Sequence, residues 1–560
     1  LSDLGRRLAA SGVQLDAVTL GDTVPPRDAA LIAEPAEPVV RLGDDLKIIG
    51  SIVDASGAPA VRELVLKEDG KVVRRPTVEP HQAERFIITH RPEKAGVHTY
   101  SLELVGEDDL AANNTATFEA QVVDQRIAVL MIEGFPRFEF KLFKAALEVD
   151  PLVDLVTISH LPGGGAYVQG TALHRNPHQG IPTSPAELFK YDVIILRDVS
   201  RAYFREGGDI SESRLRNIVE FVRKRGGGLV VTGGADVYKA GGYEDSALAA
   251  ILPFDLSNHF GTQAHFDGRF YVSVPTAAYA HPLMQLLPDA QESRRRLMAL
   301  RELDGANNVG RFKPAATPLL TRALEATGDS RHVPIMAYMP VGEGKVVASA
   351  VDTMWRWQLQ PDHDQPPLAA LLANMVRYLA PPPSLGPDAP TIRRDVASPQ
   401  VGQMLTLTTV LKYEQYDAIR HAYLTVTVTR PDGSIYRMLP RDTADQPGVY
   451  AYHVALDQAG RYEVVSEYES RRDETSFVAG AATGEYADLS ADPEAMASLA
   501  QATGGDRFDS VQAMLDARPV RPLRVEARRD LQVWNSWLLL VLGIGLISAD
   551  CYVRKRQGLA

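Results

Sequence analysis

Charged and hydroxyl side chains follow three apolar runs near the middle of the sequence. The runs are residues 127–132, 191–196 and 228–232. The candidate site residues that follow them are Glu133, Arg137, Asp198, Ser200, Gly233, Gly234 and Asp236. A carboxylate pair such as Glu133 and Asp198 can perform acid–base chemistry when the pKa of one partner is raised. These residues suggest two hypotheses, a hydrolytic site and a cleft that senses a small ligand.

A structural role explains the same residues, and we favour it. Polar side chains at strand ends commonly cap the helices that follow. Arg137 and Arg197 are also close in sequence to Glu133 and Asp198, so ion pairs can account for both carboxylates. We therefore assign no catalytic residue.

A second group of polar and aromatic side chains follows the apolar run at 345–351. It contains Asp352, Trp355, Arg356 and Trp357. Two tryptophans this close together suggest a packing anchor or an interface, and Arg356 can stack on a ring or pair with an acid. We favour internal packing against a neighbouring helix over a ligand cage.

Metal and nucleotide sites find little support in the sequence. His259, His265, Asp267 and His281 do not have a recurrent metal-ligand spacing. The glycines at 226–228 precede a strand, and no phosphate-binding glycine motif opens a helix. We expect neither a metal nor a cofactor.

The strand-end residues belong to a segment, 125–381, in which strand and helix patterns alternate. Strands are predicted at 126–132, 153–158, 191–196, 228–232 and 344–351, and helices at 138–147, 210–225 and 368–379. Alternating units of this kind predict a parallel, doubly wound sheet. Ligands of such sheets bind beyond the carboxyl ends of the strands, where the candidate residues are placed.

Two segments of short alternating strands flank this domain. Residues 36–124 and 388–480 carry turn signals such as Asp69-Gly70 and Asp432-Gly433 between the strands. The spacing predicts two immunoglobulin-like β-sandwiches. Residues 485–530 are expected to form a short helical region and linker.

Residues 1–35 have a different pattern. Leu1, Leu4 and Leu8 predict an amphipathic helix, and residues 13–20 alternate as in a strand. We interpret 1–35 as the end of an α/β domain that begins upstream. The alternative is a short N-terminal extension of the next domain.

Residues 533–553 form the longest apolar run, and the basic tail 554–560 follows it. About 20 residues at 1.5 Å each cross a ~30 Å hydrocarbon core. Trp534, Trp537 and Tyr552 lie at the ends of the run, as interfacial aromatic residues do. We predict a single transmembrane helix in a lipid bilayer. Arginines precede the span and Arg554-Lys555-Arg556 follow it, so charge alone leaves its orientation open.

Composition limits the remaining possibilities. The 560 residues are 45% hydrophobic and 23% charged, which is the balance of a globular protein. The net charge of -12 argues against nucleic acid as a partner. Cys551 is the one cysteine, so the chain has no intramolecular disulfide and no CxxC pair.

Several segments together resemble a family of large bacterial membrane proteins. The family combines a von Willebrand factor A domain, β-sandwiches, a degenerate class I glutamine-amidotransferase-like domain and a transmembrane helix. The matching segments are VLMIEGFPRFEF (129–140), LFKAAL (142–147), YDVIILRDV (191–199), RGGGLVVTGG (225–234), YAHPL (279–283), DTMWRW (352–357) and AQATGG (500–505). The resemblance implies a doubly wound, flavodoxin- or amidotransferase-like domain at 125–381 and a von Willebrand A-like end at 1–35.

The resemblance also implies that glutaminase chemistry is lost. Active relatives place a nucleophilic cysteine in a tight turn between strand and helix, and the corresponding turn, residues 232–236, has none. His281-Pro282 is similar to the His-Pro of the enzyme triad, but Leu283 stands where an acid is expected. The adhesion motif Asp-x-Ser-x-Ser of the von Willebrand domain is expected upstream of Leu1, so no metal-dependent adhesion is assigned to this chain.

From this family we expect a pseudoenzyme that acts as a scaffold in the bacterial inner membrane. The resemblance implies a periplasmic bulk and a cytoplasmic tail. It also implies protein–protein interactions with other membrane or periplasmic proteins, among them von Willebrand A-domain proteins and a MoxR-type AAA+ ATPase system. The hydrolase at Glu133 and Asp198 and the small-ligand sensor remain the alternatives.

Overall fold

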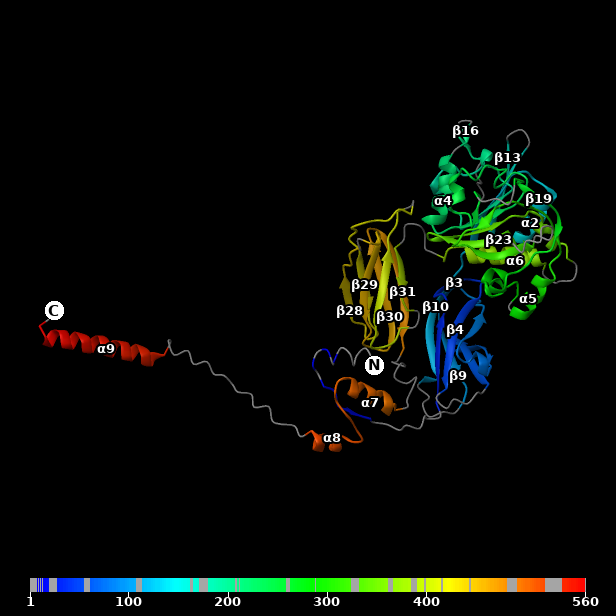
Figure 1. Ribbon diagram of the computed structural model, residues 1–560. Coiled ribbons are helices and arrows are strands. Elements are labelled where there is room, and N and C mark those ends of the chain that lie inside the picture. The colour runs from blue at the N-terminus through cyan, green and yellow to red at the C-terminus, as the bar shows by residue number, and fades with distance from the viewer. Residues whose placement is uncertain are drawn as a thin grey trace. The chain divides into compact units, whose positions relative to one another are not determined.

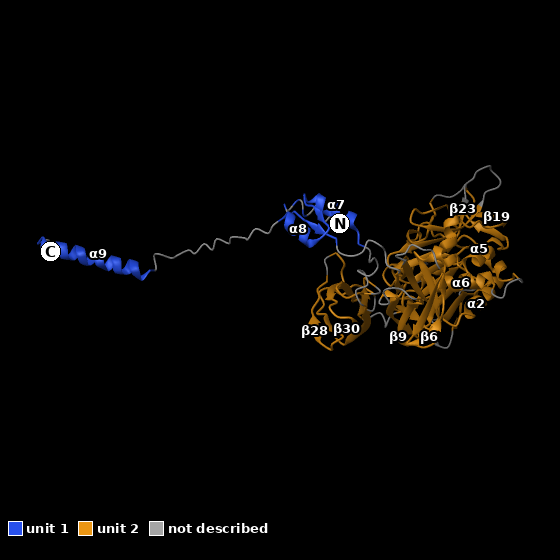
Figure 2. Ribbon diagram, turned by 90° about the horizontal axis from the view of Figure 1, so that it is seen from below, with its two compact units in different colours: residues 1–25, 490–560 blue, residues 26–489 orange. Residues whose placement is uncertain are grey.

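The architecture comes from a computed structural model of the chain, whose ribbon is drawn in Figure 1. Apart from the isolated residues 8, 10 and 12, it describes residues 14–19, 28–54, 61–106, 113–161, 165–170, 180–206, 209–210, 212–257, 262–287, 289–323, 332–360, 366–383, 390–396, 399–413, 416–442, 445–480, 491–518 and 536–558. The chain forms two compact units, one of residues 1–25 with 490–560 and one of residues 26–489. Figure 2 colours them separately.

An eight-stranded sheet forms the centre of the second unit. Its order is β13-β12-β11-β14-β17-β24-β23-β22, and the strands from β12 to β24 run parallel. The bounds are β11 (Ile127–Glu133), β12 (Val153–His160), β13 (Ala166–Gly170), β14 (Val193–Arg197), β17 (Gly228–Thr232), β22 (Thr317–Ala323), β23 (His332–Val341) and β24 (Gly344–Ser349). In chain order the five parallel strands lie 2-1-3-4-5, so the connections reverse direction between β11 and β14.

Helices cover both faces of this sheet, and each face has its own buried core. Helices α2 (Phe138–Glu148) and α6 (Pro367–Leu379) pack on one face, while α3 (Pro185–Leu188) and α4 (Glu212–Arg223) pack on the other. Because β11 is apolar at every position but its last, it can be buried on both sides. In α4, Leu215, Ile218 and Val222 recur at helical spacing and form its buried stripe. Helix α5 (Ala290–Met298) and six short strands also belong to the described part of this domain. The strands are β15 (Arg205–Glu206), β16 (Asp209–Ile210), β18 (Phe254–Asp255), β19 (His265–Phe270), β20 (Leu303–Asn307) and β21 (Arg311–Phe312).

Residues 29–123 form two packed sheets, which we call the N-terminal sandwich. One sheet has the order β2-β4-β8 and the other β3-β10-β9-β5-β6, with β7 paired to β5. The bounds are β2 (Ala29–Pro35), β3 (Val39–Arg41), β4 (Leu46–Asp54), β5 (Arg62–Glu68), β6 (Lys71–Arg74), β7 (Thr77–Val78), β8 (Phe86–His90), β9 (Gly96–Leu104) and β10 (Thr115–Val123). Side chains of both sheets meet in one core, which includes Ile48, Tyr100 and Phe118.

The predicted boundary between residues 35 and 36 is wrong. Strand β2 pairs along its whole length with β4, from Ala29 opposite Asp54 to Pro35 opposite Ile48. Residues 29–35 therefore belong to the N-terminal sandwich and not to the preceding domain. The short apolar run Ala29–Ala33 resembles either a strand end of an α/β domain or a sandwich strand, and only its long-range partner distinguishes the two.

Residues 391–479 form a second pair of sheets, the C-terminal sandwich. Its orders are β25-β26-β29 and β28-β27-β30-β31. The bounds are β25 (Thr391–Arg394), β26 (Met404–Val410), β27 (Thr425–Thr429), β28 (Ile435–Met438), β29 (Val449–Ala455), β30 (Gly460–Tyr468) and β31 (Arg471–Ala479). Alternating buried residues of β26, β27 and β29 face one core. The predicted interval 388–480 contains all seven strands.

The first unit joins residues that are far apart in sequence. Strand β1 (Ala17–Val18) pairs in parallel with β32 (Arg507–Phe508). Helices α7 (Pro493–Ala502) and α8 (Val511–Ala517) flank β32 in the chain. Both helices lie within the helical region expected at 485–530, and the structure adds the pairing of β32 with β1. Most of the helix predicted at 1–13 lies outside the described residues.

Helix α9 (Trp537–Arg556) is 20 residues long, with a mean hydropathy of 1.6, and none of it is buried. It is long and apolar enough to cross a membrane. The carboxylate of Asp550 lies 2.9 Å from Nε of Arg554, one turn later, and this pairing accounts for the acid near the end of the apolar run.

Candidate functional site at the carboxyl ends of the parallel strands

The switch point of the sheet brings the predicted residues together. Strands β11 and β14 are neighbours, and the connections leave them in opposite directions. Glu133 ends β11, Arg197 ends β14, and Asp198 follows directly. Doubly wound sheets bind ligands at such a point, and the predicted candidates Glu133 and Asp198 lie at this edge.

A row of polar side chains crosses this edge. Ser159 is in register with Glu133, Glu133 with Arg197, and Arg197 with Thr232, on four adjacent parallel strands. All four residues are at most 2% exposed. Within the described part of the chain, Oε2 of Glu133 and the hydroxyls of Ser159 and Thr232 make no hydrogen bond. A buried polar layer of this kind is costly, because polar groups lose their hydration without full compensation.

Glu133 and Arg197 form an ion pair inside that row. Oε2 of Glu133 lies 3.5 Å from Nη1 of Arg197. The guanidinium of Arg197 also lies over the ring of Phe143, 3.6 Å from its centroid. Burial raises the pKa of Glu133 to about 7, although Arg197 and Arg137 favour its charged form. Glu133 can therefore bind or release a proton near neutral pH, but its carboxyl group has almost no access to solvent.

Asp198 has an unusual backbone and a fully used carboxylate. Its φ is 47°, in the left-handed region that a non-glycine residue rarely adopts. Oδ1 accepts a hydrogen bond of 2.6 Å from the backbone N–H of Asp236, and Oδ2 pairs with Arg137. Arg137 also reaches Oδ2 of Asp352 at 3.3 Å. The acid that the hydrolase hypothesis needs is therefore held by two partners.

The glycine turn after β17 is closed by its neighbours. The side chain of Asn307 accepts a hydrogen bond of 2.9 Å from the N–H of Gly234 and donates one of 2.8 Å to its carbonyl. A methyl group at Gly233 would meet the backbone of Ala350 at 2.5 Å, and one at Gly234 would meet Oδ1 of Asp198 at 2.1 Å. Only glycine fits at these two positions, because the backbone of Ala350 lies so close to Gly233 and the carboxylate of Asp198 so close to Gly234.

Ser200 contributes through its side-chain hydroxyl and Asp236 through its backbone N–H. The hydroxyl of Ser200 accepts a hydrogen bond from the N–H of Ala202 at 3.2 Å and caps a short 3₁₀ helix, Arg201–Tyr203. The side chain of Asp236 is exposed. The structure thus joins Glu133, Arg137 and Asp198 with the glycine turn, while the Ser200 hydroxyl serves as a cap.

The aromatic segment after β24 packs inside the domain. Trp357 is 1% exposed and donates a hydrogen bond of 2.8 Å to the carbonyl of Arg301. Arg356 donates to the carbonyl of Glu302 at 2.9 Å. Trp355 contacts Phe138 edge to face, with 6.1 Å between centroids, and Asp352 pairs with Arg137. These contacts tie the segment to α2 and to the chain before β20.

Sequence reasoning missed Ser159, Thr232 and Asn307. Thr232 ends β17 and Ser159 is the penultimate residue of β12, so an alignment of the ends of the apolar strands could have found both. Asn307 has no local signal, because its partner Gly234 is 73 residues away. The described residues contain no cluster of three His, Cys, Asp or Glu side chains suited to a metal, and His259 lies outside them.

The chain was compared with known proteins. No family model and no curated protein sequence matches it. The cytoplasmic protein STM3548 of Salmonella typhimurium aligns with 17% identity and a TM-score of 0.29, over 45% of this chain and 99% of that chain. The CARDB domain of PF1109 from Pyrococcus furiosus aligns with 18% identity and a TM-score of 0.16, over 20% and 100%. Native α2-macroglobulin of Escherichia coli aligns with 10% identity and a TM-score of 0.15, over 83% and 23%. At these scores none of the three carries an argument, and the site is interpreted from its own geometry.

Proposed function

We propose that the protein is a membrane-anchored interaction protein whose α/β domain has lost enzymatic activity. The observation that carries the proposal is the state of the switch point. Both oxygens of Asp198 are engaged, Glu133 is buried against Arg197, and Asn307 closes the glycine turn. A reacting substrate needs groups free to face it, and these groups face one another.

The proposal includes membership in the bacterial membrane protein family described above. The 2-1-3-4-5 order of the parallel strands supports a flavodoxin- or amidotransferase-like domain. The two sandwiches support immunoglobulin-like modules, and β1 with β32 would be the end of a von Willebrand A-like domain. Cys551, the one cysteine, lies in α9, so a thiolate nucleophile is absent from the α/β domain.

The C-terminal sandwich offers a surface for a protein partner. Strand β28 is an edge of its sheet. Near it, the apolar side chains of Tyr423, Ile435 and Leu439 are 93%, 63% and 71% exposed. An edge strand with exposed apolar side chains favours pairing with another chain.

The proposed location is the bacterial inner membrane, with α9 as a single-pass anchor. The soluble residues would be periplasmic and the Arg554-Lys555-Arg556 tail cytoplasmic. Proposed partners are other membrane or periplasmic proteins, among them von Willebrand A-domain proteins and the MoxR-type ATPase system.

Crosslinking and mass spectrometry of the full chain in its native membrane test this function. We expect reproducible partner crosslinks on the C-terminal sandwich, and we expect Ile435→Lys to remove them. Met404→Lys is the matched control, because Met404 is also 63% exposed but lies on the inner strand β26. Recovery of the protein with crosslinks only to itself would refute the interaction function.

The hydrolase remains a second candidate because the pKa of Glu133 is raised to about 7. A substrate turnover lost in the Glu133→Ala/Asp198→Ala double variant, with folding intact, would favour it. Unchanged behaviour of the double variant would remove it. The ligand sensor at this cleft is tested by thermal shift, since a ligand at 100 times its dissociation constant adds about 2.7 kcal/mol.

A further inference from the structure

A cluster of titratable side chains lies at one end of the core of the N-terminal sandwich. It contains Glu68 of β5, Asp69 in the turn to β6, His90 of β8, and His98 and Tyr100 of β9. Buried core residues occupy the alternate positions next to Glu68, His90 and His98 on their strands, so these three side chains lie on the inner faces of the two sheets. The ring of Tyr100 stacks on Phe118 inside the core, with 5.8 Å between centroids.

His98 joins two turns of the sandwich. Its Nδ1 lies 2.7 Å from Oδ2 of Asp69, in the turn between β5 and β6. Its Nε2 lies 3.0 Å from the carbonyl oxygen of Lys94, in the connection between β8 and β9. The side chain of His98 is only 11% exposed, so water has little room to replace either partner.

Both partners of the His98 ring can only accept hydrogen bonds. An ionised carboxylate and a backbone carbonyl have no proton to donate, and a neutral imidazole has one N–H. Only the doubly protonated imidazolium can therefore form both hydrogen bonds at once. A neutral ring keeps one of them, and the bond to the charged carboxylate of Asp69 is the stronger. The contact with Lys94 is therefore the one that neutral His98 loses.

Glu68 adds negative charge on the inner side of the cluster. Its Oε1 lies 3.6 Å from Nδ1 of His98 and accepts a hydrogen bond of 2.9 Å from the hydroxyl of Tyr100. Its Oε2 lies 3.2 Å from Nε2 of His90. Two carboxylates thus face two histidines, and this arrangement favours the protonated form of His98.

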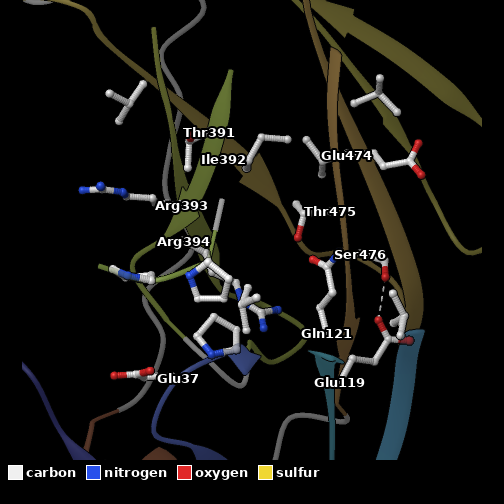
Figure 3. A pocket seen from close by; sticks show the side chains of 18 of the residues that line it. Glu37, Glu119, Gln121, Thr391, Ile392, Arg393, Arg394, Glu474, Thr475 and Ser476 are labelled. Atoms are coloured by element: carbon white, nitrogen blue, oxygen red, sulfur yellow. Dashed lines mark hydrogen bonds between the residues drawn. The ribbon is translucent and has the colours of Figure 1, made fainter. Parts of the chain in front are cut away.

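Two further charged groups lie near the cluster. Lys71 of β6 acts on Asp69 and favours its charged form. Glu119 of β10 is in register with Thr99, on the outer face of the sheet. Figure 3 shows that Glu119 accepts a hydrogen bond from Ser476 of the C-terminal sandwich, so its carboxylate is engaged away from the cluster.

The pKa values of His98 and Asp69 agree with the geometry. Burial lowers the pKa of His98, but the hydrogen bonds to Asp69 and to the Lys94 carbonyl outweigh burial, and the pKa lies above the usual 6.5. The bond with His98 lowers the pKa of Asp69 below 3.8. The stability that His98 contributes is therefore complete below about pH 6.5 and is lost as the pH rises through the pKa of the folded state. The contribution of Asp69 is present above about pH 4 and is lost below it.

We propose that His98 is a pH-sensitive clasp, which holds the β5–β6 and β8–β9 turns together when it is protonated and releases the β8–β9 turn when it is neutral. The released element is the connection 91–95 with the start of β9. Arg74 of β6 donates a hydrogen bond of 3.2 Å to the hydroxyl of Thr89. Neither group titrates near neutral pH, so this contact keeps the β5–β6 hairpin attached and the change is local. The clasp uses neither β28 nor the switch point, and the inference is independent of the proposed protein interactions.

Hydrogen-exchange mass spectrometry of the full chain in phosphatidylcholine nanodiscs tests the clasp between about pH 5 and about pH 8.5, the range in which histidines titrate. Labelling times are scaled to the intrinsic exchange rate at each pH, so that only changes in protection remain. We expect peptides covering 91–99 to lose protection about fivefold or more as the pH rises, because a hydrogen bond is lost. Peptides covering β27 of the C-terminal sandwich should show no such change.

Three variants locate the titrating group. His98→Gln should remove the pH dependence, because the glutamine side chain does not titrate. Asp69→Asn should move the transition to lower pH by on the order of one unit, because the imidazolium loses a carboxylate partner. Asparagine tolerates the φ of 48° at this position. His265→Gln is the matched control, since His265 lies 3.1 Å from Asp267 in the α/β domain, and it should leave the transition unchanged.

The inference is overturned if protection of 91–99 is independent of pH in the native chain, or if His98→Gln keeps the native transition. Loss of the transition in His265→Gln would also overturn it, because the titrating group would then lie in another domain. Should His98→Gln fail to fold, Asp69→Asn decides. A lower midpoint in that variant supports the clasp, and an unchanged midpoint overturns it.

Discussion

Glu133 Oε2 lies 3.5 Å from Arg197 Nη1, between two strands whose side chains at this row are almost completely buried. A buried ion pair costs desolvation energy that the attraction only partly offsets, and loss of one partner leaves an unpaired charge. The pair also fills the position at which a doubly wound sheet binds its ligand. The same two residues therefore close the site and set its response to pH.

The first prediction concerns that response. The pKa of Glu133 in the folded protein is raised from 4.5 to about 7, so the folded state holds a proton that the unfolded state has released. The contribution of Glu133 to stability is therefore most favourable below about pH 4.5 and is lost as the pH rises to about 7. At full ionisation the loss is on the order of 3 kcal/mol. Glu133→Gln should flatten this part of the pH profile.

Urea unfolding between pH 4.5 and 8 measures the effect. Fluorescence of Trp355 and Trp357 reports on the α/β domain when Trp534 and Trp537 are replaced by Phe. Glu148→Gln is the control, because Glu148 is an exposed acid of α2 and is not among the charges that shift the pKa of Glu133. An equal pH dependence in Glu133→Gln and the parent would show that Glu133 does not titrate in this range.

The second prediction tests the close approach of Asp198 to the glycine turn. In Gly234→Ala the new methyl group would meet Oδ1 of Asp198, which cannot move without losing Asp236 N–H or Arg137. Gly180→Ala is the matched control, since Gly180 has a φ of 154° against 155° for Gly234 but open space around it. We expect Gly234→Ala to destabilise the domain by about 2 kcal/mol more than the control. Equal urea midpoints for the two variants would contradict the packing described.

The third prediction concerns the pairing of the two chain ends in the first unit. A methyl group at Gly505 would meet the carbonyl oxygen of Leu15 at 2.1 Å. Gly505→Ala should therefore separate β1 from β32 and speed amide exchange at Ala17, whose N–H donates to Asp506. Gly480→Ala, where the nearest atom is 4.0 Å away, should leave that exchange unchanged. Hydrogen-exchange mass spectrometry of residues 14–19 measures both.

The fourth prediction uses the one thiol to test the proposed orientation. Cys551 lies one turn before Arg554 and is exposed on α9. In intact spheroplasts a membrane-impermeant maleimide should leave it unlabelled, and permeabilisation should allow labelling. A Ser434→Cys/Cys551→Ser variant should label from outside, since Ser434 is an exposed residue of the C-terminal sandwich. The reverse pattern would place the soluble units in the cytoplasm.

Local patterns were sufficient for most elements. The apolar run at 228–232 is β17 at the same residues, and the helix expected at 368–379 is α6 with Pro367 added at its first turn. The alternation of strand and helix patterns was sufficient to predict that Glu133 and Asp198 lie at strand ends. Periodicity sufficed there because burial on both faces leaves an unbroken apolar run.

Pairings between distant residues could not be predicted in this way. The sheet to which residues 29–35 belong is known only from their pairing with β4. In the same way, β1 is recognised as a strand by its pairing with β32, which lies 490 residues later. Asn307 and Gly234 likewise meet only in the folded chain.

The pairing of β1 with β32 also determines how the chain would carry tension. Because these strands are parallel, pulling β1 from its start and β32 through α9 loads their hydrogen bonds in shear. The ion pair of Asp16 with Arg518, at 2.6 Å, resists the same sliding. Residues 26–489 leave and re-enter the first unit as one inserted loop, so such a force bypasses them. A force applied across these two points would therefore load the first unit before the sandwiches and the α/β domain.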